Sequence, residues 1–290
     1  MRRFLFDRSG HLRPLWGLLL FLACFLGLAR LTGGYIHTHP MSQVRAMDLR
    51  VLSVLVPSVL CLLVERRPLA DLGLRLDRRW GKGLLAGAGL GGGIVALSAL
   101  ANRALGGFHW DGGLHAAPPL LLGTAILLFT AALNEELLFR GYPFQRLVAL
   151  LGFWPAQGLV ALLFALAHWS NPGMDGTIRV WGSVNIACAS LLLGAARRRA
   201  GDLSLPLGLH WAWNLVQGPL LGFAVSGDHR LPSLLHPVLR DRPVWISGGT
   251  FGLETTLTCA ALALGACLFL ARRPRARALQ LAPSDLPAGI

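Results

Sequence analysis

Eight apolar segments, separated by shorter polar stretches, follow one another along the chain. They are residues 14–31, 46–64, 83–105, 118–142, 153–168, 180–196, 203–225 and 255–271. Most of them approach the roughly 20 residues that a helix needs to cross a bilayer. Backbone groups in lipid must find partners within their own segment, so each span is expected to be helical. The pattern predicts an all-α, polytopic membrane bundle with eight transmembrane helices.

Two of these segments contain residues that modify the simple picture. The second holds Arg50, and its uninterrupted apolar part, residues 51–64, is short for a span; Arg50 could extend its charged end to the membrane interface. The third carries Gly83, Gly87 and Gly91 at intervals of four residues. Small residues on one helix face allow a neighbouring helix to approach closely. We therefore expect the third helix to pack tightly against another.

The domain organisation follows from the same pattern. Residues 1–271 are predicted to form a single transmembrane domain, with a charged loop at 65–82 and the longest outer loop at 226–254. Residues 272–290 are basic and then rich in proline and alanine, a composition typical of a disordered tail. No separate soluble domain is predicted.

Composition agrees with membrane insertion. The chain is 54% hydrophobic and 14% charged, with a mean hydropathy of +0.55, which indicates an integral, multi-pass protein of the plasma membrane, or of the inner membrane in a prokaryote. Its net charge of +13 could suggest nucleic-acid binding, but most basic residues fall in the same set of alternate loops. Such loops normally face the cytoplasm and suit anionic lipid headgroups. Both termini are therefore predicted to be cytoplasmic, and no nucleic-acid partner is expected.

Two adjacent carboxylates, Glu135 and Glu136, stand out in the fourth apolar segment. A charge at mid-bilayer costs about 3 kcal/mol or more, so acidic residues within a span usually face a cavity and have a function. Arg140 lies one helical turn after Glu136 and can pair with it. Glu135 lies about 100° around the helix and has no such local partner.

Later segments supply further polar residues at helical spacing. Phe164 and His168 share a helix face, as do His210 and Asn214. A carboxylate can act as general base on a water molecule, and a histidine can help to hold that water. A second histidine and an amide can donate to the oxyanion that forms on a carbonyl. The same groups could instead bind a divalent metal, because imidazole and carboxylate are ordinary zinc ligands.

The sequence lacks the signatures of several other hydrolases. It contains no HExxH helix and no G-x-S-x-G elbow. However, the order Glu-Glu-x-x-x-Arg, Phe-x-x-x-His and His-x-x-x-Asn on the later spans resembles the CAAX protease and bacteriocin-processing (CPBP) family of intramembrane endopeptidases. The resemblance covers about residues 118–225, which would form the catalytic core. It implies an eight-helix fold that cleaves a peptide bond near the C-terminus of a membrane-anchored substrate.

The resemblance also implies roles for individual residues. Glu135 would be the catalytic base and His168 its partner on the water, with His210 and Asn214 as an oxyanion or metal-site pair. Glu136, Arg140 and Phe164 would support them. A Zn²⁺ or other divalent ion, if the family uses one, would be held by Glu135, His168 and His210; a metal-free mechanism is equally open. The expected partners are the lipid bilayer and a membrane-associated peptide or protein, with or without a lipidated cysteine.

One alternative function and one geometric difficulty accompany this interpretation. Intramembrane Glu and His residues also build proton relays, so a non-catalytic transporter or an immunity or interaction protein could use the same cluster. His168 closes its segment, whereas Glu135 lies near the opposite end of its own. The break at 141–143 predicts a separate interfacial helix over 144–151 that would let the two converge. The resulting cavity is expected to open toward the cytoplasm and sideways to lipid.

Overall fold

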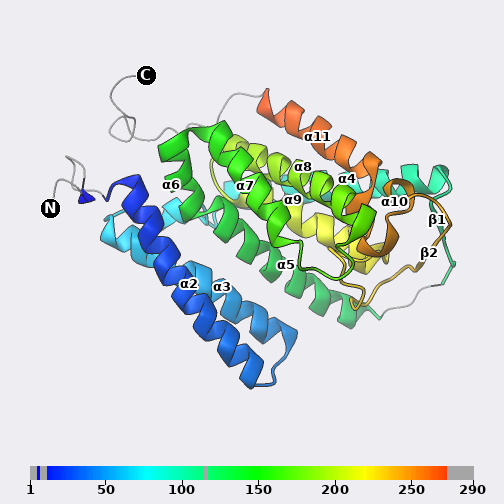
Figure 1. Cartoon of the computed structure of the whole chain (residues 1–290), viewed down its shortest axis with the longest axis horizontal. Coiled ribbons are helices and arrows are strands. Elements are labelled where there is room, and N and C mark those ends of the chain that lie inside the picture. The colour runs from blue at the N-terminus through cyan, green and yellow to red at the C-terminus, as the bar shows by residue number, and fades with distance from the viewer. Residues whose placement is uncertain (1–4, 7–11, 114–116, 273–290) are drawn as a thin grey trace.

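The computed structural model describes residues 5, 6, 12–113 and 117–272. Its main elements are helices, and Figure 1 shows them gathered in one bundle. They are α2 (Pro14–Thr38), α3 (Gln43–Val64), α4 (Arg78–Ala104), α5 (Pro118–Arg140), α6 (Tyr142–Leu151), α7 (Phe153–Ala167), α8 (Gly176–Ala200), α9 (Ser204–Leu215) and α11 (Leu257–Ala271). The tail predicted to be disordered falls, apart from Arg272, outside the described residues.

Each of the eight predicted segments coincides with one of these helices. Five stretches of the described chain are long and apolar enough to cross a membrane: α2, α3, α4, α8, and α5 together with α6. Helices α7 and α11 are apolar but have 15 residues each. The chain is therefore an integral multi-pass membrane protein, while the number of crossings and the side of the termini stay predictions.

The seventh segment, predicted as a span over residues 203–225, is shorter than expected. Helix α9 ends at Leu215 and continues only as a π-helical turn, η2 (Val216–Leu220). Pro219 has no backbone N–H to extend the ladder, and Gly222 adopts a positive φ of 82°. The chain consequently turns back at this point and does not continue as a helix to Val225.

The segment after this turn folds back over the end of the bundle. It contains strand β2 (Pro237–Leu239), which pairs antiparallel with β1 (Phe108–Trp110), and then α10 (Val244–Ser247), η3 (Gly249–Phe251) and η4 (Leu253–Thr255). Apart from this small pair of strands and an isolated bridge at each of two turns, the described structure is helical. The described structure therefore agrees with the predicted all-α class, apart from this small pair of strands and the two bridges.

The glycines of α4 lie against α9, which confirms the predicted close contact. A Cβ added at Gly87 would meet the carbonyl oxygen of Leu205, and one at Gly91 would meet that of Leu209. Gly208 on α9 lies equally close to the carbonyl of Leu84. Backbone therefore meets backbone along this interface, which fixes how far α9 projects into the bundle.

Helix α6 is separate from α5, as the break at Gly141 predicted. It is anchored to the residue that follows α3: the Tyr142 hydroxyl donates to Glu65 Oε1 at 2.5 Å, and Arg146 Nη1 lies 3.3 Å from Glu65 Oε2. Glu65 is buried, with 1% of its surface exposed. This carboxylate ties α3 to α6 and so holds the start of α7 in place.

The two ends of the bundle differ in character. We call residues 65–82, 141–152 and 197–203 the arginine-rich end, because they contain the basic loops. We call residues 105–113, 169–175 and 221–256 the strand end, because β1, β2 and α10 lie there. Figure 1 shows α6 at one side of the bundle and α10, β1 and β2 at the other. If the positive-inside rule holds, the strand end faces away from the cytoplasm.

Candidate active site

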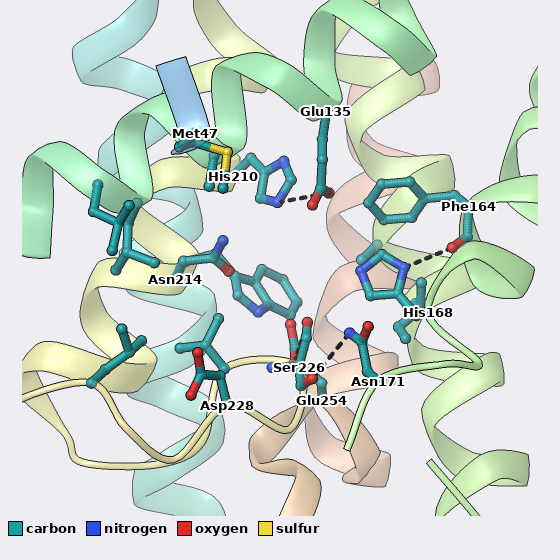
Figure 2. Close-up of a pocket in the computed structure, with 18 of the residues that line it drawn as sticks. Met47, Glu135, Phe164, His168, Asn171, His210, Asn214, Ser226, Asp228 and Glu254 are labelled. Atoms are coloured by element: carbon teal, nitrogen blue, oxygen red, sulfur yellow. Dashed lines mark hydrogen bonds and ion pairs between the residues drawn. The ribbon is translucent and has the colours of Figure 1, made fainter. Parts of the chain in front are cut away.

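A cavity of about 450 Å³ lies in the middle of the bundle and extends toward the strand end. Its walls come from α3, α5, α7, α8 and α9, together with residues 225–231 and Glu254. It is lined by five of the residues singled out in the sequence: Glu135, Phe164, His168, His210 and Asn214. Figure 2 shows these side chains surrounding one space, so helices distant in sequence converge as predicted.

Glu136 and Arg140 lie behind this cavity and form the expected ion pair. Arg140 Nη1 donates to Glu136 Oε1 at 3.0 Å, and neither side chain is exposed. Arg140 Nη2 also donates to the Ser190 hydroxyl on α8 at 2.6 Å, and its guanidinium lies 4.6 Å from the centre of the Phe164 ring. The pair therefore ties α5 to α7 and α8, while its supporting role in catalysis stays a prediction.

His210 connects the two glutamates, a contact that the sequence did not predict. Its Nδ1 lies 2.9 Å from Glu136 Oε1, and its Nε2 lies 3.7 Å from Glu135 Oε2. Because a carboxylate can only accept, Nδ1 is the donor to Glu136 when that carboxyl is ionised. The buried Glu136–Arg140 pair thus orients the imidazole of His210 so that Nε2 faces Glu135 and the cavity.

Glu135 differs from its neighbour in both exposure and partners. One third of its side chain is exposed, at 33%, whereas Glu136 is completely buried. Its Oε2 atom has no hydrogen-bond partner among the described residues. Oε2 itself is buried and lies 3.7 Å from His210 Nε2, so the exposed remainder of the side chain is the part that can meet water or a substrate group.

His168 faces the same space from the end of α7. Its Nδ1 lies 2.7 Å from the carbonyl oxygen of Phe164, so Nδ1 carries the proton and Nε2 of the neutral ring is an acceptor. Figure 2 shows its ring directed into the cavity. Helix α6 follows α5 and precedes α7 along the chain, as the break at residues 141–143 predicted, while its interfacial position stays a prediction.

Asn214 lies one helical turn after His210 and also lines the cavity. In the described part of the chain its side chain makes no hydrogen bond, which leaves the amide available to a ligand. Asn185 on α8 lines the cavity as well, but its Nδ2 donates to the carbonyl of Thr256 at 3.1 Å. Asn185 therefore bridges two segments of the protein.

The side chains proposed as metal ligands are not arranged as a metal site. Within residues 5, 6, 12–113 and 117–272, no group of three His, Cys, Asp or Glu side chains is close enough together to hold an ion. Glu135 and His210 are neighbours, but His168 does not complete a set with them. The arrangement of these side chains therefore gives no support to a bound metal. The chemistry available to the site uses protein side chains and water.

Glu254 is the main site residue that the sequence reading missed. It lines the cavity with 8% of its surface exposed, and its Oε2 accepts hydrogen bonds from the backbone N–H and the hydroxyl of Ser226, at 2.6 and 3.0 Å. Burial raises the pKa of this carboxyl. The only hint in the sequence was that Glu254 lies immediately before an apolar segment. An acidic residue in a loop commonly occupies such a position, so the sequence did not mark it as a site residue.

A second missed group surrounds the outer part of the cavity. The Asn171 side chain donates to the carbonyl of Ser226 at 3.0 Å, which joins the end of α7 to the segment after α9. Asp228 and Arg230 stand at the rim, with 33% and 76% of their side chains exposed. Figure 2 shows Asn171, Ser226 and Glu254 together on one side of the cavity.

The exposed rim of the cavity lies at the strand end, and the side of the membrane that this end faces stays a prediction. The buried Glu136–Arg140 pair closes the cavity toward the arginine-rich end, while exposed Asp228 and Arg230 lie at the strand end. A cytoplasmic opening was expected because Glu135 lies near the cytoplasmic end of its predicted span. Gln43 and Arg50 of α3, both exposed, also line the cavity.

A comparison with protein families identifies this part of the chain. Residues 117–216 match the model of the family described as type II CAAX prenyl endopeptidase Rce1-like. No curated protein matches the chain. The matched segment includes Glu135, His168, His210 and Asn214. This segment is therefore similar to the Rce1-like type II CAAX prenyl endopeptidases, consistent with a CPBP family intramembrane protease.

Proposed function

We propose that this protein is an intramembrane endopeptidase that hydrolyses a peptide bond near the C-terminus of a membrane-anchored, CAAX-type substrate. The observation that carries the proposal is the placement of Glu135, His168, His210 and Asn214 around one cavity within the matched domain. The cysteine of such a substrate can bear a prenyl chain, which would stay in the surrounding lipid. The cavity would receive the peptide that follows this cysteine.

The first chemical step is attack by water on the scissile carbonyl. The carboxylate of Glu135, whose side chain is one third exposed, takes one proton from the water. His168 Nε2 accepts a hydrogen bond from the other O–H of the water and orients its lone pair. The water oxygen forms a bond to the carbonyl carbon, and the electron pair of the C=O π bond moves onto the carbonyl oxygen.

The resulting oxyanion needs hydrogen-bond donors that are already in place. We assign this role to the Asn214 amide and to His210 in its imidazolium form, in which Nε2–H donates to the oxyanion while Nδ1–H donates to Glu136. Glu136 holds the His210 ring through Nδ1 at 2.9 Å, so the ring does not have to reorient during the reaction. A donor of this kind is worth about 10²- to 10³-fold in kcat.

The second step releases the two products. The oxyanion reforms the carbonyl as the C–N bond breaks, and the proton held by Glu135 passes to the leaving amine. This returns Glu135 to its ionised form and leaves a new carboxylic acid and a new amine. All groups used are protein side chains and one water molecule, so the cycle balances without a further co-reactant.

Transport and a purely structural role have less support. The cavity ends at the buried Glu136–Arg140 pair, so it does not continue as a polar path to the arginine-rich end. The family match concerns a peptidase and includes each of the four assigned residues. An interaction protein would not need a partly exposed carboxylate such as Glu135 inside this cavity.

The proposal is tested with purified protein and internally quenched peptides that end in CAAX sequences, with and without a prenylated cysteine. We expect Glu135→Gln, His168→Ala and His210→Ala each to lower kcat/KM by about 10²-fold or more. Asp48→Asn and His109→Ala are matched controls, because both residues are exposed and neither lines the cavity. Full activity of Glu135→Gln would end its assignment as the base.

The same assay addresses the metal question. Since the described His and carboxylate groups do not gather as a metal site, we expect activity to survive treatment with a chelator. Loss of activity that is restored by adding Zn²⁺ would instead assign Glu135, His168 and His210 as ligands in a rearranged, loaded enzyme.

A further inference from the structure

One face of α3 forms part of the cavity wall beyond the assigned catalytic groups. Gln43, Ala46, Met47 and Arg50 all line the cavity, and their spacing of three, four and seven residues places them on one side of the helix. Figure 2 shows Met47 at the cavity wall. The cavity therefore extends from Glu135 along α3, and Arg50 stands on that extension.

Two arginines line the cavity in the described structure, and only one of them is paired with a carboxylate. Arg230 is already paired: its Nε and Nη2 donate to the two oxygens of Asp228 at 2.9 and 3.0 Å. Arg50 has no carboxylate partner among the described residues, and its side chain is exposed. Of the two, Arg50 is the cation that can still bind an anion.

The described groups around Arg50 also include no acid that could neutralise its charge. Arg50 belongs to an apolar helix and lines a second groove of about 480 Å³ between α2, α3 and α5. The polar side chains that share this groove, Thr32, His37, Ser53 and Asn134, include no acid. Elsewhere the cavity wall carries the carboxyl groups of Glu135, Asp228 and Glu254, and Arg230 is paired with Asp228, so Arg50 is the arginine left to attract an anion.

We propose that Arg50 binds the terminal carboxylate of the substrate. This inference rests on the proposed function, because a CAAX sequence stands at the C-terminus of its protein and ends in a free α-carboxylate. The planar guanidinium matches a carboxylate through two parallel hydrogen bonds. With the carboxylate held at Arg50 and the scissile carbonyl at Glu135, the protein selects a bond at a set distance from the chain end.

The experiment compares two quenched peptides that are identical except for their C-termini, one a carboxylate and the other a carboxamide. We expect the wild-type, full-length protein to prefer the carboxylate in kcat/KM by at least about tenfold, as for a hydrogen-bonded charged pair. Arg50→Gln should remove this preference by raising KM for the carboxylate peptide, with little change for the carboxamide. Arg50→Lys, which keeps the charge but loses the planar fork, should retain part of it.

Two further variants serve as references. Arg45→Gln changes an exposed arginine on the same helix that does not line the cavity, so it should leave the preference intact. Arg230→Gln tests the other lining cation and should also leave it intact. Loss of the preference in Arg230→Gln alone would place the carboxylate at the rim and overturn the assignment to Arg50.

Other outcomes separate this inference from the proposed function. Equal cleavage of both peptides by the wild type would refute carboxylate recognition and leave the peptidase standing. An equal loss on both peptides in Arg50→Gln would show that Arg50 acts through the fold or by binding a lipid phosphate, which also refutes it. Cleavage of neither peptide by the wild type would overturn both the inference and the proposed function.

Discussion

Glu135 and Glu136 are neighbours in the sequence but occupy different environments. Glu136 points into packed protein, where Arg140 and His210 share its Oε1 atom. Glu135 points into the cavity, where its Oε2 atom lies 3.7 Å from His210 Nε2 and makes no hydrogen bond among the described residues. Helical geometry separates their directions by about 100°, which is why one can be structural and the other chemical. The pairing with Arg140 was predictable from spacing; the contact with His210 was not, because it joins residues 74 positions apart.

This difference predicts opposite effects of the same substitution. Glu136→Gln removes the charge that compensates completely buried Arg140, so it should lower the free energy of unfolding by about 3–5 kcal/mol. Glu135→Gln, at a partly exposed position, should change it by less than about 1 kcal/mol while abolishing turnover. Thermal unfolding in detergent measures both. Comparable melting temperatures for the two variants would contradict the structural role of Glu136.

Helices α4 and α9 show how one element positions another. The α4 glycines allow α9 to approach until backbone meets backbone, and α9 carries His210 and Asn214. The glycine spacing predicted a close contact, but the partner helix was not identifiable from the sequence. Nor was the early end of α9, because the hydrophobic run continues through Val225 although Pro219 and Gly222 prevent a regular helix.

Two glycine substitutions on α4 test this positioning. A methyl group at Gly91 would collide with the backbone carbonyl of Leu209, next to His210, whereas one at Gly89 would meet no atom within 4 Å. We expect Gly91→Ala to reduce both the melting temperature and kcat, because α9 must move. Gly89→Ala should leave activity unchanged and stabilise the helix by up to about 1 kcal/mol. Equal behaviour of the two variants would show that the α4–α9 distance is unimportant.

At the scale of the whole molecule, the exposed rim of the cavity and the basic loops lie at opposite ends of the bundle. The arginine-rich end is closed by buried polar pairs, and the strand end carries the exposed rim residues Asp228 and Arg230. If the basic loops are cytoplasmic, the peptide must enter from the outer side or sideways through lipid. The orientation of the protein in its membrane therefore decides which substrates can reach Glu135.

Cysteine labelling measures this orientation directly. In a variant without the five native cysteines, we expect Arg230→Cys to react with a membrane-impermeant maleimide added outside intact cells. Arg66→Cys, an exposed position at the arginine-rich end, should react only after the membrane is opened. The reverse pattern would place the cavity mouth in the cytoplasm and show that the charge distribution misleads here.

The sequence by itself determined the class of the protein and the identity of its chemical groups. Apolar run lengths imply membrane helices, because lipid leaves the backbone no other partner, and i, i+4 spacing brings Phe164 to His168 and His210 to Asn214. Only the tertiary structure decided which groups meet. The contact of His210 with both glutamates, the inclusion of Glu254 and the closure of one end arise from helices far apart in sequence. Packing between such helices depends on side-chain shape across an interface, which local periodicity does not encode.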